Sequence, residues 1–306
     1  MEKIFKKRLI VALAAMLCCA LWGSATPFIK TGYALIMPHG GVPSTLLFAG
    51  TRFMLAGVLT ILIYSIASRK LLVPQKKNIG KILLVGLFQT VIQYIFFYVG
   101  LANTTGVKGT VLSGSNAFFS LIIASLIFHQ EKLTVKKIFA CIIGFAGVIL
   151  INLNGLDFNM NFFGDAFVIF SSAAYGVSSA LMKKFSKDEN PVIISGYQFF
   201  AGGIFMMLCG AFSGGHISIA TPSAAGVMVY LALLSATAYS LWGILLKYNP
   251  VSKVTIYTFL IPVFGVILSS IMLAENSNVP FVNLIITLIL ISIGVLMLNY
   301  KKESDK

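Results

Sequence analysis

The chain has 306 residues, of which 58% are apolar and only 10% are charged. This balance lies far outside that of a soluble globular domain and predicts a chain that folds in a lipid bilayer. A net charge of +14 would indicate nucleic-acid binding in a soluble protein. Here the positions of the charges are better explained by membrane topology, so no nucleic-acid partner is expected.

Ten apolar segments follow one another along the chain, and most have about the 20 residues that a helix needs to cross hydrocarbon. They are residues 9–29, 46–66, 82–101, 109–128, 138–153, 164–182, 192–212, 224–246, 254–274 and 279–298. The fifth is short and needs snorkelling by Lys136 and Lys137, or local thinning of the bilayer, to span it. The predicted fold class is an all-α integral membrane protein with ten transmembrane helices.

The basic residues predict the orientation of the chain. If all ten segments cross the bilayer, all but three of the 23 Lys and Arg residues lie on one side, the exceptions being Lys30, Arg52 and Lys108. Cytoplasmic loops are enriched in Lys and Arg, so a multi-pass protein of the cell membrane with both termini in the cytoplasm is expected. The apolar run at residues 9–29 exceeds a normal signal core and is interpreted as the first crossing rather than as a cleaved signal peptide.

The first five segments resemble the last five weakly. The residues paired across the halves are Trp22 with Tyr175, Arg52 with Gln198, and Glu131 with Glu275, at offsets of 153, 146 and 144. A repeat with an odd number of crossings enters the bilayer from opposite sides in its two copies. Residues 1–153 and 154–306 are therefore predicted to form two inverted five-helix repeats within one membrane domain, an arrangement typical of secondary transporters.

Several motifs resemble the EamA branch of the drug/metabolite transporter superfamily, and the resemblance covers the whole chain. They are Trp22-Gly23 in the first segment, Arg52-Phe53 in the second, Gly100-Leu101-Ala102 with Thr104-Thr105-Gly106-Val107, a fourth segment that ends at Glu131, and residues 136–153 with Gly144 and Gly147. The resemblance implies a ten-helix carrier with a central cavity between its halves, commonly an exporter of amino acids or related small metabolites. It does not imply a particular substrate, since Asn116 lacks a clear counterpart in the second half and Pro262 stands opposite Phe118.

Polar and aromatic side chains inside the apolar segments are the candidates for a solute pathway, because polar groups in hydrocarbon are costly unless they face the bundle interior. Gln89 and Gln93, at i and i+4, share one helical face. The predicted cavity residues are Trp22, Gln89, Gln93, Tyr94, Asn116, Tyr175, Ser178, Tyr239, Trp242 and Tyr257. As alternatives, Ser side chains bond back to their own helix, and Trp242 anchors the chain at the membrane interface, one turn before Lys247.

Arg52 is the one charged residue well inside a predicted segment, and it has two interpretations. It holds a substrate carboxylate through a bidentate pair, or it snorkels to the interface or pairs with Asp165. Pro27 and Pro262 interrupt the first and ninth segments and are either pathway-forming helix breaks or fixed bends. Gly144 and Gly147 are expected to pack within the monomer, because their spacing is not that of the four-residue dimer motif.

The sequence lacks the residues that proton coupling through a carboxylate, metal binding or catalysis within the membrane would require. None of the nine acidic residues lies at a predicted bilayer midplane, which favours facilitated diffusion or exchange over proton coupling through a carboxylate. Glu131 and Glu275 each end a segment and are expected to cap the N-terminus of the following helix. No cofactor and no metal are predicted, and an enzyme is disfavoured because no His/Asp/Glu constellation lies at membrane depth.

Amides, hydroxyls and rings with little fixed charge suit neutral or zwitterionic small molecules. The sequence thus predicts a secondary transporter that moves amino acids or similar metabolites by alternating access. Two alternatives remain open: a carrier of larger substrates, such as nucleotide sugars or lipid-linked sugars, and a non-transporting membrane scaffold. The larger substrates call for several basic residues facing the cavity, and only Arg52 and Lys30 qualify.

Overall fold

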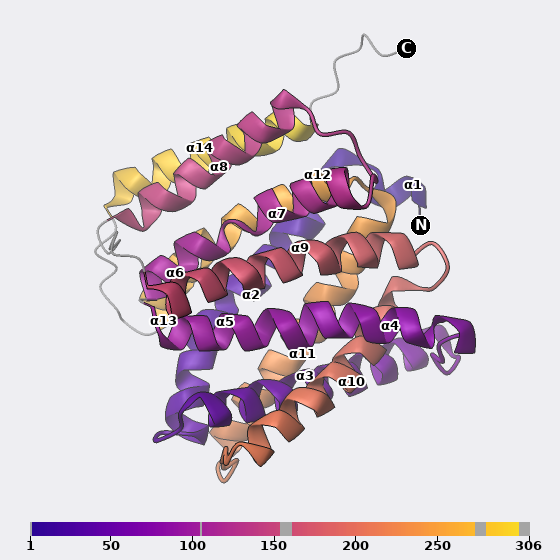
Figure 1. The fold of residues 1–306 in the computed structure, drawn as a ribbon, viewed down its shortest axis with the longest axis vertical. Coiled ribbons are helices and arrows are strands. Elements are labelled where there is room, and N and C mark those ends of the chain that lie inside the picture. Colours follow the sequence, from indigo (N-terminus) through magenta and orange to yellow (C-terminus); the bar gives the residue numbers. More distant parts are fainter. Residues whose placement is uncertain (1, 105, 154–160, 273–279, 300–306) are drawn as a thin grey trace.

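The computed structural model describes residues 2–104, 106–153, 161–272 and 280–299, and within these ranges the regular secondary structure is helical. The helices form one bundle (Figure 1). In chain order they are α1 (Glu2–Phe5), α2 (Arg8–Ile36), α3 (Val42–Ser68), η1 (Lys76–Asn78), α4 (Ile79–Gly86), η2 (Leu87–Ile92), α5 (Gln93–Ala102), α6 (Gly106–Ser113), α7 (Asn116–Ile122), η3 (Ile123–Ile127), α8 (Val135–Ile151), η5 (Phe162–Ala166), α9 (Phe167–Phe185), α10 (Pro191–Phe212), α11 (Pro222–Tyr248), α12 (Val251–Thr255), η6 (Ile256–Phe259), α13 (Leu260–Met272) and α14 (Phe281–Asn299).

Eight helical stretches are long and apolar enough to cross a membrane, so the chain is a multi-pass membrane protein. They are Arg8–Ile36, Val42–Ser68, Lys76–Ala102, Gly109–Ile127, Phe162–Phe185, Pro191–Phe212, Pro222–Tyr248 and Val251–Ser269. Two shorter helices accompany them: α8 has 17 residues, and the apolar part of α14 spans Val282–Leu298. Every predicted segment overlaps a helix, while ten membrane crossings remain a prediction.

The first crossing is longer than expected. The predicted first segment ends at residue 29, but α2 continues to Ile36 and passes through Pro27 without a break. The added turns pack against neighbouring helices. A Cβ on Gly32 would lie 3.0 Å from the Phe48 ring and 3.3 Å from Val227. Burial of this stretch explains why the helix persists beyond the predicted end of the segment.

The fourth and ninth helices are interrupted at equivalent places. Between α6 and α7 the chain forms a turn at Gly114 and Ser115, and between α12 and α13 it forms the 3₁₀ turn η6. The offset of 144 that pairs Glu131 with Glu275 carries residue 114 to position 258, inside η6. Pro262 lies in the first turn of α13, where proline is tolerated. Proline cannot donate to the carbonyl four residues earlier, which here is residue 258 inside η6, so the interruption lies where Pro262 disturbs a helix. Whether this is a pathway-forming break or a fixed bend stays a prediction.

The contact between α3 and α10 is symmetric. If each residue of one helix is replaced by the residue at the equivalent position of the other, the same pairs of residues are in contact. A Cβ on Gly50 would lie 2.3 Å from the backbone nitrogen of Met207, and a Cβ on Gly203 would lie 2.3 Å from that of Met54. Both exchanges, Gly50 with Gly203 and Met54 with Met207, have an offset of 153. Glycine thus lets the two backbones approach where a side chain would clash.

A second set of contacts in this helix pair has the same offset. A Cβ on Gly57 would lie 2.4 Å from the Phe200 nitrogen, and one on Gly210 would lie 2.4 Å from the Leu47 nitrogen. The sequence-based pairing of Arg52 with Gln198, at an offset of 146, is therefore wrong for these helices by seven residues. Seven residues are about two helical turns, so an apolar helix matches nearly as well in either register.

The α8–α14 pair repeats the pattern at an offset of 147. A Cβ on Gly147 would lie 3.2 Å from the carbonyl oxygen of Thr287, and a Cβ on Gly294 would lie 2.7 Å from that of Ala140. The Thr287 hydroxyl also donates to the Gly147 carbonyl at 3.1 Å. Since Gly144 faces Phe259, both glycines of this motif pack within the chain, as predicted. Figure 1 shows α8 with α14 at one edge of the bundle and α3 with α10 at the opposite edge.

Candidate functional site

Four aromatic side chains from three helices form a central aromatic cluster: Trp22, Tyr94, Tyr239 and Trp242. The Trp22 ring on α2 makes edge contacts with Tyr239 at 5.0 Å and Trp242 at 4.9 Å, both on α11. The hydroxyl groups of Tyr94, on α5, and Tyr239 are hydrogen-bonded at 2.7 Å. The cluster joins predicted site residues from both halves of the chain. Trp242 is 1% exposed, so its interpretation as an interfacial anchor is wrong.

Two phenylalanines outside the set of predicted cavity residues complete the walls of this cluster. Phe53 on α3 and Phe199 on α10 stack at 5.1 Å. Phe53 lies 4.5 Å from Tyr94, and Phe199 lies 4.8 Å from Tyr239. Phe53 belongs to the Arg52-Phe53 motif, but polarity, the criterion used to choose cavity residues, does not select an apolar ring. The predicted site therefore lacked α3 and α10, apart from Arg52.

Several buried polar atoms next to the cluster have no hydrogen-bond partner among the described residues. They are the indole nitrogens of Trp22 and Trp242 and the hydroxyls of Tyr175 and Ser179. Tyr175 lies beside Ser179 and Trp242. An indole N–H only donates, and a buried donor left unpaired costs about 1–3 kcal/mol. These groups are thus available to a solute that offers hydrogen-bond acceptors.

Gln89 and Gln93 are buried, as expected for side chains that face the bundle interior, and the Oε1 atom of each lacks a partner. Gln89 belongs to η2, a π-helical turn, and π turns are frequent at functional sites. The α-helical spacing assumed from the sequence does not hold there. Tyr94, next to Gln93, reaches the central aromatic cluster.

Arg52 is 3% exposed and donates from Nε and Nη2 to the Ser235 hydroxyl, at 3.2 and 2.9 Å. Its guanidinium carbon lies 5.1 Å from the centre of the Phe53 ring. It therefore does not snorkel to the interface. It is not paired with Asp165 either, which accepts the Thr104 hydroxyl at 2.7 Å. No carboxylate of the described ranges forms an ion pair with Arg52.

A hollow of about 340 Å³ opens beside Tyr33 and Tyr98. It lies between the C-terminal ends of α2 and α5 and the first turn of α3, and its walls include Tyr33, Met37, Thr45 and Tyr98. Tyr33 and Tyr98 both interact electrostatically with Arg52. The hollow and the buried guanidinium thus share two tyrosines. Tyr33 and Tyr98 lie outside the set of site residues that the sequence predicted.

Three predicted site residues lie apart from the hydrogen bonds and ring contacts of the cluster. The Ser178 hydroxyl donates back to the Tyr175 carbonyl at 2.8 Å, which is the structural alternative considered above. Tyr257 is buried in the same apolar core as Trp242, and its carbonyl accepts the Cys19 thiol at 3.1 Å. Asn116 is half-buried at the first residue of α7, beside the helix break.

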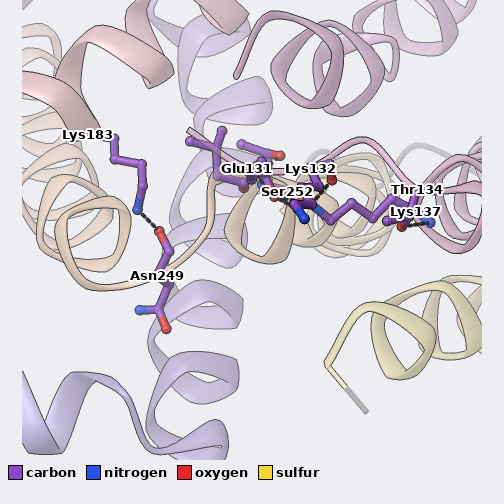
Figure 2. Close-up of polar contacts among 9 residues, drawn as sticks. Glu131, Lys132, Thr134, Lys137, Lys183, Asn249 and Ser252 are labelled. Atoms are coloured by element: carbon purple, nitrogen blue, oxygen red, sulfur yellow. Dashed lines mark hydrogen bonds and ion pairs between the residues drawn. The ribbon is translucent and has the colours of Figure 1, made fainter. Parts of the chain in front are cut away.

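A second polar cluster, shown in Figure 2, lies at the end of the bundle where α9 ends and α8 begins. Glu131 is nearly buried and accepts the Ser252 backbone N–H at 2.8 Å and the Ser252 hydroxyl. It also pairs with Lys137 at 2.6 Å. Glu131 does cap a helix N-terminus, but that of α12 rather than of the next helix, which Thr134 caps. Glu275 lies outside the described residues.

Lys183 closes the same end of the bundle. Its Nζ donates to the carbonyl oxygens of Leu246, at 3.1 Å, and Asn249 (Figure 2). These carbonyls terminate α11 and have no partner within the helix. Asn249 in turn donates from Nδ2 to the Phe5 carbonyl at 2.9 Å. The cluster thereby ties α9, α11 and the N-terminal helix together.

The described ranges contain no cluster of metal-binding side chains. No set of three or more His, Cys, Asp or Glu side chains in the described ranges is placed to hold a metal ion. The four cysteines are free thiols. The donors that the bundle interior offers are therefore hydroxyls, amides, indoles and one guanidinium.

A multi-pass helical bundle with interrupted helices and a buried aromatic and polar centre is the architecture of membrane transport proteins. The sequence profile of the EamA-like transporter family matches residues 9–153 and 162–300. The chain belongs to the EamA-like transporter family, a branch of the drug/metabolite transporter superfamily. The resemblance described from the sequence is thus confirmed.

Similar proteins come from bacteria, archaea and plants. The chain is 24% identical to the uncharacterized transporter YvbV of Bacillus subtilis, over 100% of this chain and 96% of that protein. It is 25% identical to an uncharacterized transporter of Archaeoglobus fulgidus, over 88% and 91%, and 22% identical to a WAT1-related chloroplast protein of Arabidopsis thaliana, over 92% and 69%. A protein crystal structure matches with a TM-score of 0.78 at 16% identity, over 96% and 97% of the two chains, which supports the fold alone.

Proposed function

We propose that this transporter has ten transmembrane helices arranged as two inverted five-helix repeats, residues 1–153 and 154–306. Three observations support the proposal: the α3–α10 and α8–α14 contacts map onto themselves on exchange, the fourth and ninth helices are interrupted at equivalent positions, and the family profile matches in two parts. With five crossings per repeat, the halves insert in opposite directions. The charge distribution supports cytoplasmic termini and residence in the cell membrane.

The transported solutes, in this proposal, are amino acids or similar small neutral or zwitterionic metabolites, exported by alternating access. The observation that carries it is the central aromatic cluster, where both halves meet and the buried indole N–H groups of Trp22 and Trp242 have no acceptor among the described residues. A small solute with a carboxylate supplies such acceptors. Aromatic rings bury the apolar part of the solute and accept its ammonium group on their faces.

Movement takes place as exchange or facilitated diffusion in this scheme. Carboxylates of the described chain lie at helix ends or in turns, as Glu131 and Asp188 do, rather than in the central aromatic cluster. Alternating access then requires only that the two repeats rock about the shared centre. The interruptions at Gly114 and in η6 are suited to such motion, because short helical pieces move as separate units.

The experiment is solute counterflow in proteoliposomes that contain the purified full chain. Liposomes are loaded in turn with each of the proteinogenic amino acids, and uptake of the same labelled amino acid is followed. We expect exchange for at least one of them, reduced in Trp242→Phe, which loses the buried N–H and keeps a ring. The matched control is Phe212→Leu, which changes an aromatic residue on the exposed surface of α10.

A parallel set of liposomes is loaded with UDP-glucose. Exchange of UDP-glucose without exchange of any amino acid would overturn the proposed substrate class and favour the larger substrates. Absence of flux for every solute, with the chain correctly inserted, would contradict transport of either class.

A further inference from the structure

We infer that Arg52 and Ser235 form the anchor for the carboxylate group of the substrate, reached through the hollow between Tyr33 and Tyr98. This inference rests on the proposed function and names the group by which the site recognises its solute. The residues come from α3 and α11, so the anchor lies between the two halves of the chain.

The Arg52 guanidinium does not use all of its N–H donors in hydrogen bonds to Ser235. Nε and Nη2 converge on one oxygen, the Ser235 hydroxyl, at 3.2 and 2.9 Å. That hydroxyl donates its own hydrogen to the Leu231 carbonyl at 2.9 Å, which orients its lone pairs toward Arg52. A guanidinium carries five N–H groups in a planar fork. The Ser235 hydroxyl and the neighbouring Tyr98 phenol therefore take up part of the fork, and its remaining N–H groups are open to a further acceptor.

The charge of Arg52 also has no counter-charge among the described carboxylates. The side chain is 3% exposed and forms no ion pair with a described carboxylate, and its neighbours are the Phe53 face and the phenols of Tyr94 and Tyr98. A buried cation is costly unless it is paired, and Arg stays charged in proteins. A carboxylate that arrives with the solute supplies both the counter-charge and two oxygens for a bidentate pair.

The hollow gives this anchor an approach from one side of the membrane. Tyr33 and Tyr98 line it and interact with Arg52. Its other wall residues include Ala102, the last residue of the crossing Lys76–Ala102. The opposite end of this crossing lies beside Glu189, which accepts the Gln75 N–H at 3.0 Å. At about 340 Å³ the hollow lies at the small end of ligand pockets and suits a solute of amino-acid size.

The opposite end of the bundle is held closed in the same structure. Glu131 joins the loop before α8 to α12, and Lys183 joins α9 to the end of α11. An anchor open toward the hollow and closed toward this cluster matches one of the two states that alternating access requires. The carboxylate is thus presented to Arg52 from the side of the hollow in this state.

The test compares solutes that differ only at the carboxylate. Each amino acid that the wild-type chain exchanges in proteoliposomes is offered beside its amide and its decarboxylated amine, for example L-leucine beside leucinamide and isopentylamine. The variants are Arg52→Gln, Arg52→Lys and Ser235→Ala. The matched control is Arg8→Gln, which removes an exposed guanidinium at the start of α2.

We expect the wild type to prefer the amino acid over its amide and amine by roughly tenfold or more, the discrimination of one charge-assisted pair. Arg52→Gln should weaken the apparent affinity for the amino acid by roughly ten- to a hundredfold, with Arg52→Lys intermediate and Arg8→Gln unchanged. Ser235→Ala should weaken it less than Arg52→Gln does. Equal exchange of amine and amino acid by the wild type, or unchanged affinity in Arg52→Gln, would overturn the inference.

A binding measurement separates failure of the anchor from failure of the proposed function. The thermal unfolding midpoint of the purified chain is compared in sodium benzoate and in sodium chloride of equal concentration, since a ligand of the folded state raises the midpoint. Benzoate should stabilise the wild type and Arg8→Gln but not Arg52→Gln. Stabilisation without any amino-acid flux would retain the anchor and reject the proposed substrates, and no stabilisation of the wild type would reject the anchor. The comparison of wild type in the two salts decides the question even if Arg52→Gln does not fold.

Discussion

The phenolic oxygens of Tyr94 and Tyr239 lie 2.7 Å apart and form a hydrogen bond between α5 in the first half of the chain and α11 in the second. Both rings also contact the Phe53–Phe199 stack. If the halves rock against each other during transport, this bond lies at their meeting point. It therefore stabilises one conformation relative to the other as well as the fold itself.

Replacement of either tyrosine tests this bond. Tyr94→Phe and Tyr239→Phe should each lower stability by about 0.5–1.5 kcal/mol, the net value of a hydrogen bond, and the double variant by little more than either alone. Thermal unfolding in detergent measures the three changes. The control, Tyr248→Phe, removes a hydroxyl outside the cluster and should leave the midpoint in place. Fully additive losses would show that the two hydroxyls do not interact.

The indole nitrogens of Trp22 and Trp242 have no acceptor among the described residues, so removing them should affect transport more than stability. Trp22→Phe and Trp242→Phe remove donors that have no acceptor in the described structure, so the hydrogen-bonding term should cost no stability. The apparent KM for an exchanged amino acid should nevertheless rise by roughly ten- to a hundredfold, the value of one hydrogen bond to a charged group. A lowered unfolding midpoint with unchanged KM would mean that the indoles serve packing alone.

Gly50 and Gly203 should be equally intolerant of a methyl group. A Cβ atom added at either residue would lie 2.3 Å from a backbone nitrogen of the partner helix. Gly50→Ala and Gly203→Ala are each expected to destabilise the fold by about 1–3 kcal/mol or more through overpacking. Gly226→Ala, in α11 with open space around it, should instead stabilise by about 0.5–1 kcal/mol. Thermal unfolding ranks the three variants, and a tolerated Gly203→Ala would contradict the exchange relationship.

Glu131→Gln should loosen the polar end of the bundle. The variant keeps an acceptor for Ser252 but loses the charge that pairs with Lys137 and favours the N-terminus of α12. A loss of about 1–3 kcal/mol is expected, since the carboxylate is nearly buried and bonded to charged and backbone donors. Glu2→Gln, which breaks an exposed pair with Lys6, is the control and should leave the unfolding midpoint unchanged.

Hydropathy was sufficient to locate the helices, because lipid requires long apolar stretches whatever their tertiary contacts. It could not show the interruptions in the fourth and ninth helices. Gly114-Ser115 is a weak breaker, and η6 consists of Ile256–Phe259, residues that favour regular structure elsewhere. Packing against neighbouring helices decides such breaks. Of the two prolines considered as breaks, Pro27 lies inside the uninterrupted α2, whereas Pro262 lies in the first turn after η6.

The candidate site was predictable where polarity and aromaticity coincide, at Tyr94, Tyr239 and Trp242. It was not predictable where the contribution is apolar, as with Phe53 and Phe199, or where it depends on which helix faces which. The partner of Arg52 is an example. Two alternatives followed from its depth in the segment, yet the structure places it against Ser235, a residue 183 positions further along the chain.

The self-mapping contact between α3 and α10 means that the information for both of its sides is contained in a single half of the chain. A five-helix polypeptide carrying only the Gly50 to Gly57 surface could form the same seam with a second copy of itself inserted in the opposite direction. The seam thus has the geometry of a self-complementary, dual-topology dimer. The halves differ at positions such as Asn116 and Pro262, whereas at this seam and at the α8–α14 contact they are still interchangeable.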